Sequence, residues 1–443
     1  RKAGRSSPPP RDTAKWMEQN QRARIKCVLR EYFGFDSLRP LQQKVVSAFL
    51  SGRDCFVRAA TGSGKSLCYQ LPPLLLNKCA VVISPLISLM EDQVKSLEQA
   101  NITACALTST NTDGKTWSGA LRGDYTMIYM APERFESWKH GIRKLVGEGR
   151  VCLFAIDEAH CISEWGHDFR SAYRCLHQLR DSFPSIPIMA LTATATERVE
   201  GDVIRSLKLQ NPVVAKSGMD RPNLHYSVHP KNCMQLDLSP ALFRSATGAE
   251  GHGSVIIYCL SRQKTEDIAN WLSSKGIKAK AYHGSLASHQ RTEIHRMFSF
   301  DELQVVAATI AFGMGIDKPD IRMVVHYGMP KTMEAYVQQT GRAGRDGQPA
   351  RCVMFWSNAD LGMSNFYVKN ITTTSGFRDF RTRSAAIEGF AKSGACRRAY
   401  LLNYFGEKYE NGRGDGHSSN CHGCDNCDAE NRALAAAQMG EGA

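Results

Sequence analysis

Long apolar runs, a secretory signal and an excess of acidic residues are all missing from this chain. A helix that crosses a bilayer needs about eighteen or more consecutive apolar residues, so we expect no transmembrane segment and no membrane partner. Without a secretory signal, the cysteines scattered through the apolar runs are expected to be reduced core thiols, and the last four of the fifteen differ from them in spacing. Lysine and arginine outnumber aspartate and glutamate by 56 to 43, which gives a formal net charge of +13. This balance favours a polyanionic partner, although a basic surface can also serve only solubility.

Regular hydrophobic patterning is missing from the two ends of the chain. Residues 1–15 include three consecutive prolines and several charges, and we expect a disordered or poorly ordered tail over 1–24. A second tail is expected at 431–443. The chain begins at Arg1 and not at methionine, so we interpret it as a piece of a longer protein. Its 443 residues suffice for about two to four domains.

Between the tails, short apolar runs alternate with helical stretches. We expect strands at 54–58, 79–84, 104–107, 125–130, 151–157 and 187–192. After a polar, less regular connection at about 211–225, the alternation resumes, with strands expected at 254–259, 278–282, 303–309 and 322–327, and continues to about 356. Such alternation predicts an α/β fold with two parallel sheets, each covered by helices.

A phosphate-binding loop lies between the apolar run at 55–57 and a helix-like run that starts near Ser66. Its residues are Ala60, Thr61, Gly62, Ser63, Gly64, Lys65 and Ser66. The glycines allow backbone N–H groups to point at phosphate oxygens. Lys65 is expected to reach the β- and γ-phosphates, and Ser66 to hold Mg²⁺. Ala59 replaces the first glycine of the usual pattern and is small enough to fit. The second half has no such loop, so we expect the nucleotide site between the two sheets.

Two acidic residues follow the buried apolar run at 151–156 and therefore project from the carboxyl end of a strand. Asp157 is expected to bind Mg²⁺ through its oxygens. Glu158 is the better general base, because its carboxylate can orient a water molecule for in-line attack. Together with the phosphate loop, this acid pair predicts hydrolysis of a nucleoside triphosphate.

Further motifs follow in order, and with them the chain resembles the RecQ helicases, DNA-unwinding members of helicase superfamily two. The resemblance covers about 30–428 and is carried by the phosphate loop, the terminal cysteines and motifs at 33–42, 84–89, 157–169, 192–194, 311–316 and 338–347. The segments 88–93 and 162–165 are most similar to the Werner-type branch. The resemblance implies two RecA-like domains, at 25–215 and 216–357, and a helical zinc-binding module at 358–430.

The resemblance also implies roles for residues on both sides of the nucleotide. Gln42 is assigned to adenine, with Arg39 and Phe35 packing the base, although simple core packing of Phe35 is as good an interpretation. Arg342 and Arg345 lie three positions apart after Gln338, and an arginine finger stabilises the charge on the transferring phosphoryl group, raising the rate on the order of 10³–10⁵. We expect Arg345 to be the finger and Arg342 to be the second choice. The alternative is a solvated helix face, which the glycines at 341 and 344 disfavour.

An aromatic-rich segment directly after the acid pair is a plausible platform for single-stranded DNA. Its candidates are Trp165, His167, Phe169 and Arg170, and the resemblance assigns this loop to the coupling of DNA binding with ATP hydrolysis. Core packing of the two aromatic residues at helical spacing is the alternative; we favour the DNA role for Trp165 and Arg170 and leave Phe169 open. By the same resemblance, Ser84, His160 and Gln338 are placed among the DNA-binding or coupling residues.

The last four cysteines form a spacing typical of metal sites. Cys421, Cys424 and Cys427 follow a C-x₂-C-x₂-C pattern, and Cys396 precedes them at the start of a helix-like run. Four thiolates suit a closed tetrahedral Zn²⁺ site, which is structural and not catalytic. An iron–sulfur cluster is an alternative, and the resemblance decides for zinc. Two spare donors, His417 and His422, could substitute for a cysteine.

The resemblance therefore implies a nuclear, ATP-dependent 3′-to-5′ DNA helicase of replication, recombination and repair. Its cofactors would be ATP, Mg²⁺ and Zn²⁺, and its partners single-stranded and duplex DNA. One alternative is an RNA helicase, against which the zinc module and the aromatic-rich loop argue. Another is a nucleic-acid-binding module with little turnover, against which Lys65, Asp157, Glu158 and Arg345 argue. About sixteen residues follow Cys427, too few for the winged-helix domain of many RecQ proteins, so we expect poor strand separation or a short form.

Overall fold

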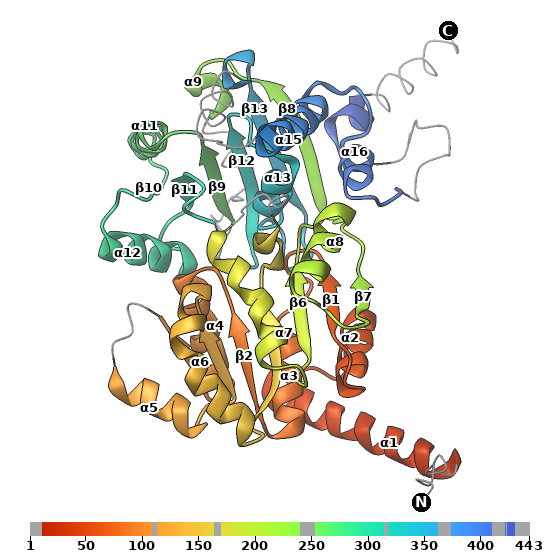
Figure 1. The fold of residues 1–443 in the computed structure, drawn as a ribbon. Helices are drawn as coiled ribbons and strands as arrows, with labels where there is room; N and C mark the ends of the chain where they lie inside the picture. Colours follow the sequence, from red (N-terminus) through yellow and green to blue (C-terminus); the bar gives the residue numbers. More distant parts are fainter. Residues whose placement is uncertain are drawn as a thin grey trace, which may run out of the picture.

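The computed structural model describes residues 11–108, 113–163, 170–239, 253–313, 318–361, 374–409, 421 and 423–429. In these ranges the chain forms two parallel sheets, one above the other in Figure 1, and a helical module beside the second sheet. The predicted α/β fold is therefore confirmed. None of the helices in the described ranges combines the length and the hydropathy needed to span a bilayer.

The first helix, α1 (Arg11–Val28), precedes the sheets and leads into a short π-helical segment, η1 (Leu29–Phe33). Residues 11–24, which we expected in a disordered or poorly ordered tail, belong to this helix. The prolines end at Pro10, and many of the residues that follow are good helix formers such as alanine, lysine, glutamine and arginine. Local propensity supports a helix here without a regular apolar face.

The first sheet contains seven parallel strands in the order β3-β4-β2-β5-β6-β1-β7. They are β1 (Cys55–Arg58), β2 (Cys79–Ile83), β3 (Ala104–Leu107), β4 (Met127–Met130), β5 (Val151–Ile156), β6 (Ile188–Thr192) and β7 (Val213–Lys216). All six strands expected in this half are present, to within two residues at each end. Strand β7 was missed, because it is short, half-buried and at the sheet edge, inside the stretch interpreted as a connection.

Helices cover both faces of this sheet and bury a separate core on each face. One face carries α2 (Pro40–Leu50), α3 (Leu67–Leu76) and α4 (Ile87–Gln99). The other carries α5 (Gly114–Arg122), α6 (Pro132–Gly147), α7 (Gln178–Ser182) and α8 (Glu197–Ser206), with the 3₁₀ segments η2 (Ala159–Ile162) and η3 (Ser171–His177). Strands buried on both faces need apolar side chains at nearly every position, which is why their runs stand out in the sequence.

The second sheet contains six parallel strands in the order β10-β11-β9-β12-β13-β8. They are β8 (Leu224–Pro230), β9 (Ser254–Cys259), β10 (Ala279–Tyr282), β11 (Val305–Ala308), β12 (Ile321–Tyr327) and β13 (Ala350–Trp356). Its helices are α9 (Met234–Asp237), α11 (Arg262–Ser274), α12 (Ser288–Ser299) and α13 (Met333–Thr340). The strand β8 begins at the end of the stretch interpreted as a connection, and it forms an edge of the sheet.

The C-terminal module contains α15 (Thr374–Lys392), α16 (Arg397–Tyr404) and the cysteine-bearing segment that ends the described chain. This segment packs against the edge strand β8: the backbone N–H of Tyr226 donates to the carbonyl of Gly423 at 3.0 Å, and that of Val228 donates to Asp425 Oδ2 at 2.8 Å. The module is therefore joined to the second sheet through hydrogen bonds that an edge strand leaves available.

The parallel topology fixes where chemistry can occur. Strands β1 and β5 end at the same edge of the first sheet, and they are followed by the phosphate loop and by Asp157. The turn after α13 in the second half lies against that loop, since Arg345 Cγ is 3.3 Å from the place a Cβ on Gly62 would occupy. The candidate site is thus at the interface between the two sheets.

Candidate functional site

The phosphate loop connects β1 to the N-terminus of α3, which is the strand–loop–helix arrangement expected from the sequence. Gly62 and Gly64 have φ values of +79° and +82°, a region that other residues rarely adopt. Lys65 Nζ donates to the carbonyls of Ala59 at 2.9 Å and Ala60 at 3.1 Å, so its ammonium lies over the loop. Ala59 itself is fully buried, which agrees with the small side chain found in place of glycine.

The acid pair lies beside the loop, at the end of β5. Glu158 adopts a left-handed conformation with φ +48°, and its backbone N–H donates to Asp157 Oδ1 at 3.0 Å. A non-glycine residue in this conformation is held there by its surroundings and is often part of a functional site. His160 is fully buried, and its Nδ1 lies 2.9 Å from Thr192 Oγ1 and 3.2 Å from Glu158 Oε2. His160 therefore links the acid pair to the motif at 192–194.

The charges around the loop influence one another. Burial, and secondly the Glu158 carboxylate, raise the pKa of Asp157 to about 7, while Lys65 opposes that shift. Burial lowers the pKa of Lys65, and the carboxylates of Glu158 and Asp157 oppose that change. A nearby divalent cation would stabilise the ionised form of this buried carboxylate. The oxygens of Asp157 and Ser66 are donors of the kind that Mg²⁺ prefers.

The predicted adenine residues lie at the start of α2 and hold the phosphate loop in this structure. Arg39 Nη1 donates to the carbonyl of Ser63 at 2.9 Å, and Gln42 Nε2 donates to that of Gly64 at 3.0 Å. The Gln42 Oε1 atom accepts from the backbone N–H of Arg39 at 2.9 Å. Phe35 is 53% exposed, which excludes the core position considered for it, and its ring is accessible from solvent.

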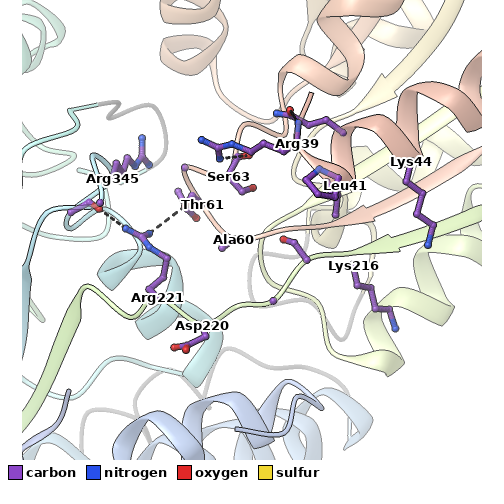
Figure 2. A pocket seen from close by; sticks show the side chains of 17 residues that line it. Arg39, Leu41, Lys44, Ala60, Thr61, Ser63, Lys216, Asp220, Arg221 and Arg345 are labelled. Carbon is purple, nitrogen blue, oxygen red and sulfur yellow. Dashed lines mark hydrogen bonds between the residues drawn. The ribbon is translucent and has the colours of Figure 1, made fainter. Parts of the chain in front are cut away.

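A cavity of about 660 Å³ opens between the two halves (Figure 2). Its walls come from the start of α2, the phosphate loop, the segment that links the two sheets, and the turn after α13; they include Arg39, Gln42, Thr61, Arg221 and Arg345. The volume is in the range of small-molecule sites. Phe35 is not part of these walls.

The structure separates the two candidate finger residues. Both follow α13, which ends at Thr340, and they lie in a turn and not on one helical face. Arg345 lines the cavity, packs over Gly62, and its charge contributes to the lowered pKa of Lys65. Arg342 is only 3% exposed and lies inside the second half, where it opposes the burial-driven rise in the pKa of Tyr258. The geometry therefore favours Arg345, as the sequence argument did.

The DNA-coupling candidates are described only in part. Trp165, His167 and Phe169 lie outside the described residues. Ser84 is buried at the end of β2, and Arg170 Nη1 donates to the neighbouring carbonyl of Pro85 at 2.7 Å. Gln338 is half-buried on α13. The described candidates thus lie on segments next to the acid pair and the finger turn.

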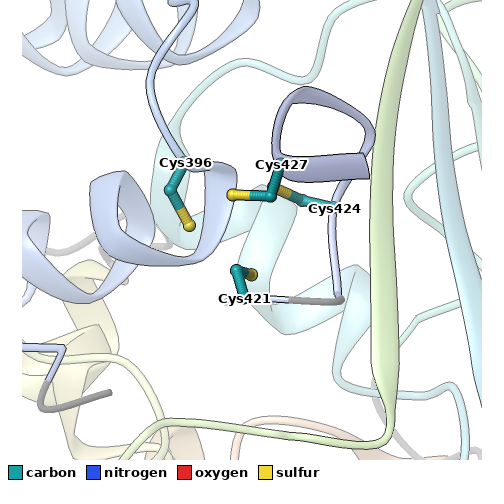
Figure 3. Close-up of side chains that lie close together, drawn as sticks. All are labelled: Cys396, Cys421, Cys424 and Cys427. Atoms are coloured by element: carbon teal, nitrogen blue, oxygen red, sulfur yellow. The ribbon is translucent and has the colours of Figure 1, made fainter. Parts of the chain in front are cut away.

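The four terminal cysteines converge (Figure 3). The Sγ atoms of Cys396, Cys421, Cys424 and Cys427 all lie within 4.8 Å of one another, and all four side chains are buried. Four sulfurs at this spacing suit tetrahedral coordination of a single metal ion. Helix α16 begins directly after Cys396, which acts as its N-cap. The two spare donors, His417 and His422, lie outside the described residues.

Several residues that the structure shows near the site were not predicted from the sequence. Arg221 reaches the phosphate loop and the finger turn, and Arg58, at the end of β1, pairs with Glu407 of the C-terminal module at 2.9 Å. In the second half, His326 Nε2 lies 2.8 Å from Gln339 Oε1 on α13, the helix that precedes the finger turn. No local pattern marks them: the partners of Arg221 and Arg58 lie more than 120 positions away, and that of His326 lies 13 positions away.

Three family models match successive parts of the chain: DEAD/DEAH box helicase at 39–201, helicase conserved C-terminal domain at 239–347, and RecQ zinc-binding at 363–428. Similar proteins include the bifunctional 3′-5′ exonuclease/ATP-dependent helicase WRN of Mus musculus, 44% identical over 87% of this chain, and the ATP-dependent DNA helicase RecQ of Pasteurella multocida, 43% identical over 90%. The chain spans 28% and 61% of the length of these two relatives.

A solved structure shares the fold at low sequence identity. The helicase Lhr of Mycobacterium smegmatis, bound to single-stranded DNA and AMP-PNP, matches with a TM-score of 0.60 and 19% identity. The match covers 83% of this chain and 57% of that one. At this identity the likeness concerns the arrangement of the two sheets.

Proposed function

Because the chain belongs to the RecQ family of ATP-dependent DNA helicases, we propose that it hydrolyses ATP between its two sheets and uses each cycle to move 3′ to 5′ along single-stranded DNA. One observation carries the proposal: an arginine of the second half, Arg345, packs over the phosphate loop of the first half. A site built from both halves is sensitive to their relative position, which a motor requires.

The described residues divide the chemistry between them. Lys65 and the backbone N–H groups of the loop bind the β- and γ-phosphates, and Glu158 orients the attacking water. Asp157 and Ser66 would hold Mg²⁺, which supplies positive charge to the phosphate oxygens. Arg345 stabilises the charge that spreads over the transferring phosphoryl group. Two observations support this division: the charges of Lys65, Asp157 and Glu158 influence one another, and Arg345 lines the cavity beside the loop.

Nucleotide binding would also change contacts that the loop makes in this structure. The ammonium of Lys65 must exchange the carbonyls of Ala59 and Ala60 for phosphate oxygens. Gln42 must exchange the carbonyl of Gly64 for the adenine edge. ATP binding would then draw the two halves together around the phosphates, and hydrolysis would let them separate. If the two halves bind DNA phosphates in alternation, each cycle moves the protein one step along the strand.

The zinc module has a structural part in this proposal. A closed four-cysteine site contributes folding energy and leaves no coordination position for substrate. The module covers one edge of the second sheet, because its cysteine segment is hydrogen-bonded to β8.

The proposal is tested by ATPase and unwinding assays on the purified chain. We expect slow hydrolysis without nucleic acid, stimulation by single-stranded DNA, and unwinding of a 3′-tailed duplex in preference to a 5′-tailed one. Stronger stimulation by RNA than by DNA would instead support the RNA helicase. Binding of DNA with no ATP hydrolysis in any condition would instead support a nucleic-acid-binding protein that lacks turnover.

The coupling role of Trp165 belongs to the same proposal. Trp165→Ala should reduce the stimulation by DNA far more than it reduces DNA affinity, because phosphate contacts supply most of the affinity. A large fall in melting temperature with normal stimulation of the folded fraction would show a core role for Trp165.

Nuclear localisation is proposed on the likeness to the Werner-type branch alone. Relatives come from both eukaryotes and bacteria, such as mouse and Pasteurella. Imaging of the fluorescently tagged protein in its source cells tests this, and an exclusively cytoplasmic signal would reject it.

A further inference from the structure

The segment between β7 and β8 contributes an arginine to the interface of the two sheets. Arg221 lies two residues past the buried Met219 and three before β8, and its side chain is half-buried in the wall of the cavity. Figure 2 shows its guanidinium between the phosphate loop and the turn that carries Arg345. This position lets a single side chain contact both halves.

The contacts of Arg221 divide between the halves. Its Nη1 donates to the carbonyl of Thr61 in the phosphate loop at 3.4 Å. Its Nη2 donates to the carbonyls of Ala343 at 3.0 Å and Gly344 at 2.7 Å, directly before Arg345. A planar guanidinium carries five donors in a fixed geometry, so it can serve carbonyls on two sides, which an ammonium does less well.

The turn that Arg221 holds has little freedom. Gly344 has φ +55°, and a Cβ there would lie 2.5 Å from Asn223 Nδ2 and 2.8 Å from the carbonyl oxygen of Gln348. Asn223 Nδ2 donates to the carbonyls of Gly344 at 2.9 Å and Gln348 at 2.8 Å. The backbone next to Arg345 is therefore fixed from the side of the linking segment.

These contacts connect the phosphate loop, the finger turn and the linking segment to one another at the wall of the cavity. Arg345 packs over Gly62, which follows Thr61 in the loop. Arg221 bonds both to the turn of Arg345, at Gly344, and to Thr61. The linking segment is itself anchored, because Arg398 of the C-terminal module pairs with Asp220 and donates to the carbonyl of Arg221 at 2.8 Å. Movement of the loop relative to the finger turn must therefore change the contacts of Arg221.

We propose that Arg221 is a positioning residue that ties the phosphate loop to the finger turn and sets where Arg345 lies over the transferring phosphate. This inference rests on the proposed ATPase. Arg221 acts through Arg345, so its loss should slow the chemical step and leave nucleotide binding nearly intact. Misplacement of a catalytic group by about 1 Å costs on the order of 10²-fold in rate.

The test compares ATP hydrolysis by the whole chain and by Arg221→Lys, which keeps the charge. We expect kcat to fall on the order of 10- to 100-fold and KM for ATP to change less than about threefold. Arg322→Lys is the matched control: Arg322 also holds the finger turn, through Asp346 at 2.6 Å and the carbonyl of Pro349 at 3.1 Å, but none of its hydrogen bonds among the described residues crosses to the first half. We expect Arg322→Lys to lower kcat less than about threefold.

A double variant shows whether Arg221 acts through the finger. If it does, Arg221→Lys combined with Arg345→Ala should be no slower than Arg345→Ala alone, because groups that act as a unit are not additive. Multiplicative losses, a raised KM with unchanged kcat, or equal losses in Arg221→Lys and Arg322→Lys would overturn the proposal. If the unmodified chain does not hydrolyse ATP, the proposed function fails; if it does and Arg221→Lys matches it, only this inference fails.

Discussion

At the scale of single residues, the site depends on charges that the fold has partly removed from water. Lys65, Asp157 and Glu158 face one another at one sheet edge, and Arg345 approaches them from the other half. Such groups interact more strongly than surface charges because less water screens them. The residues that carry the proposed chemistry can therefore be tested one at a time.

Arg345→Ala should lower kcat on the order of 10³-fold, since an arginine finger acts on charge that develops in the transition state. Binding of a fluorescent ATP analogue should change little. The measurement is steady-state ATPase beside nucleotide titration; equal losses in affinity and rate would show a ground-state contact instead.

His326 gives a prediction on pH. It is buried against Gln339 Oε1, and burial lowers its pKa to about 4 from an ordinary value near 6.5. The unfolded chain therefore takes up a proton below about pH 6.5, while the folded chain does not until about pH 4. The stability is complete above pH 6.5 and falls with decreasing pH, by up to about 1.4 kcal/mol per unit.

His326→Gln keeps a hydrogen-bonding partner for Gln339 and removes this titration. Denaturant unfolding at several pH values should show a shallower loss of stability in the variant between pH 6.5 and 4. Identical pH profiles for the two proteins would mean that His326 is accessible to protons in the folded state.

At the scale of elements, the C-terminal module connects to both halves. The buried Arg58 at the end of β1 pairs with Glu407 at 2.9 Å and donates to the carbonyl of Phe405 at 2.8 Å. Glu407 also accepts from the backbone N–H of Met219 at 2.8 Å, and Tyr404 donates to Glu334 on α13 at 2.6 Å. The end of α16 thereby contacts the strand that leads to the phosphate loop and the helix that leads to the finger.

Glu407→Ala should lower the free energy of unfolding by about 3–5 kcal/mol, because it leaves the charge of Arg58 buried without its partner. The control is Asp181→Ala, which breaks an exposed ion pair with Lys208 and should cost far less stability. Denaturant titration of both variants checks this, and similar small losses would show that Arg58 finds other compensation.

The metal site is tested by Cys424→Ser. Folded yield should fall, since metal-binding energy in a small module is folding energy. Elemental analysis of the unmodified chain should find about one zinc per chain, the stoichiometry of a four-cysteine site. Iron with a coloured protein, or no metal, would contradict the assignment.

Local sequence was sufficient for the elements and motifs that depend on neighbouring residues. Strand β5 is a continuous buried run, and the phosphate loop and the cysteine spacing are contiguous signals, so they could be predicted. The helix α1 and the edge strand β7 carry weaker patterns and were missed. Arg221 and Glu407 could not be found, because their partners lie 160 and 349 positions away and only the fold brings them together.

At the scale of the whole molecule, the two sheets contribute to one candidate site. The cavity proposed for the nucleotide lies between them, Arg221 and Arg345 connect them, and the C-terminal module anchors the linking segment. A site assembled from two bodies responds to anything that moves one relative to the other, and DNA held across both is the partner that we propose.

The most direct test of this account is the rate of ATP hydrolysis by the purified chain, with and without single-stranded DNA, beside Lys65→Ala. We predict slow turnover without DNA, clear stimulation with it, and no turnover in a Lys65→Ala protein whose circular dichroism and melting match the unmodified chain. Undiminished hydrolysis by Lys65→Ala, or none by the unmodified chain in either condition, would contradict it.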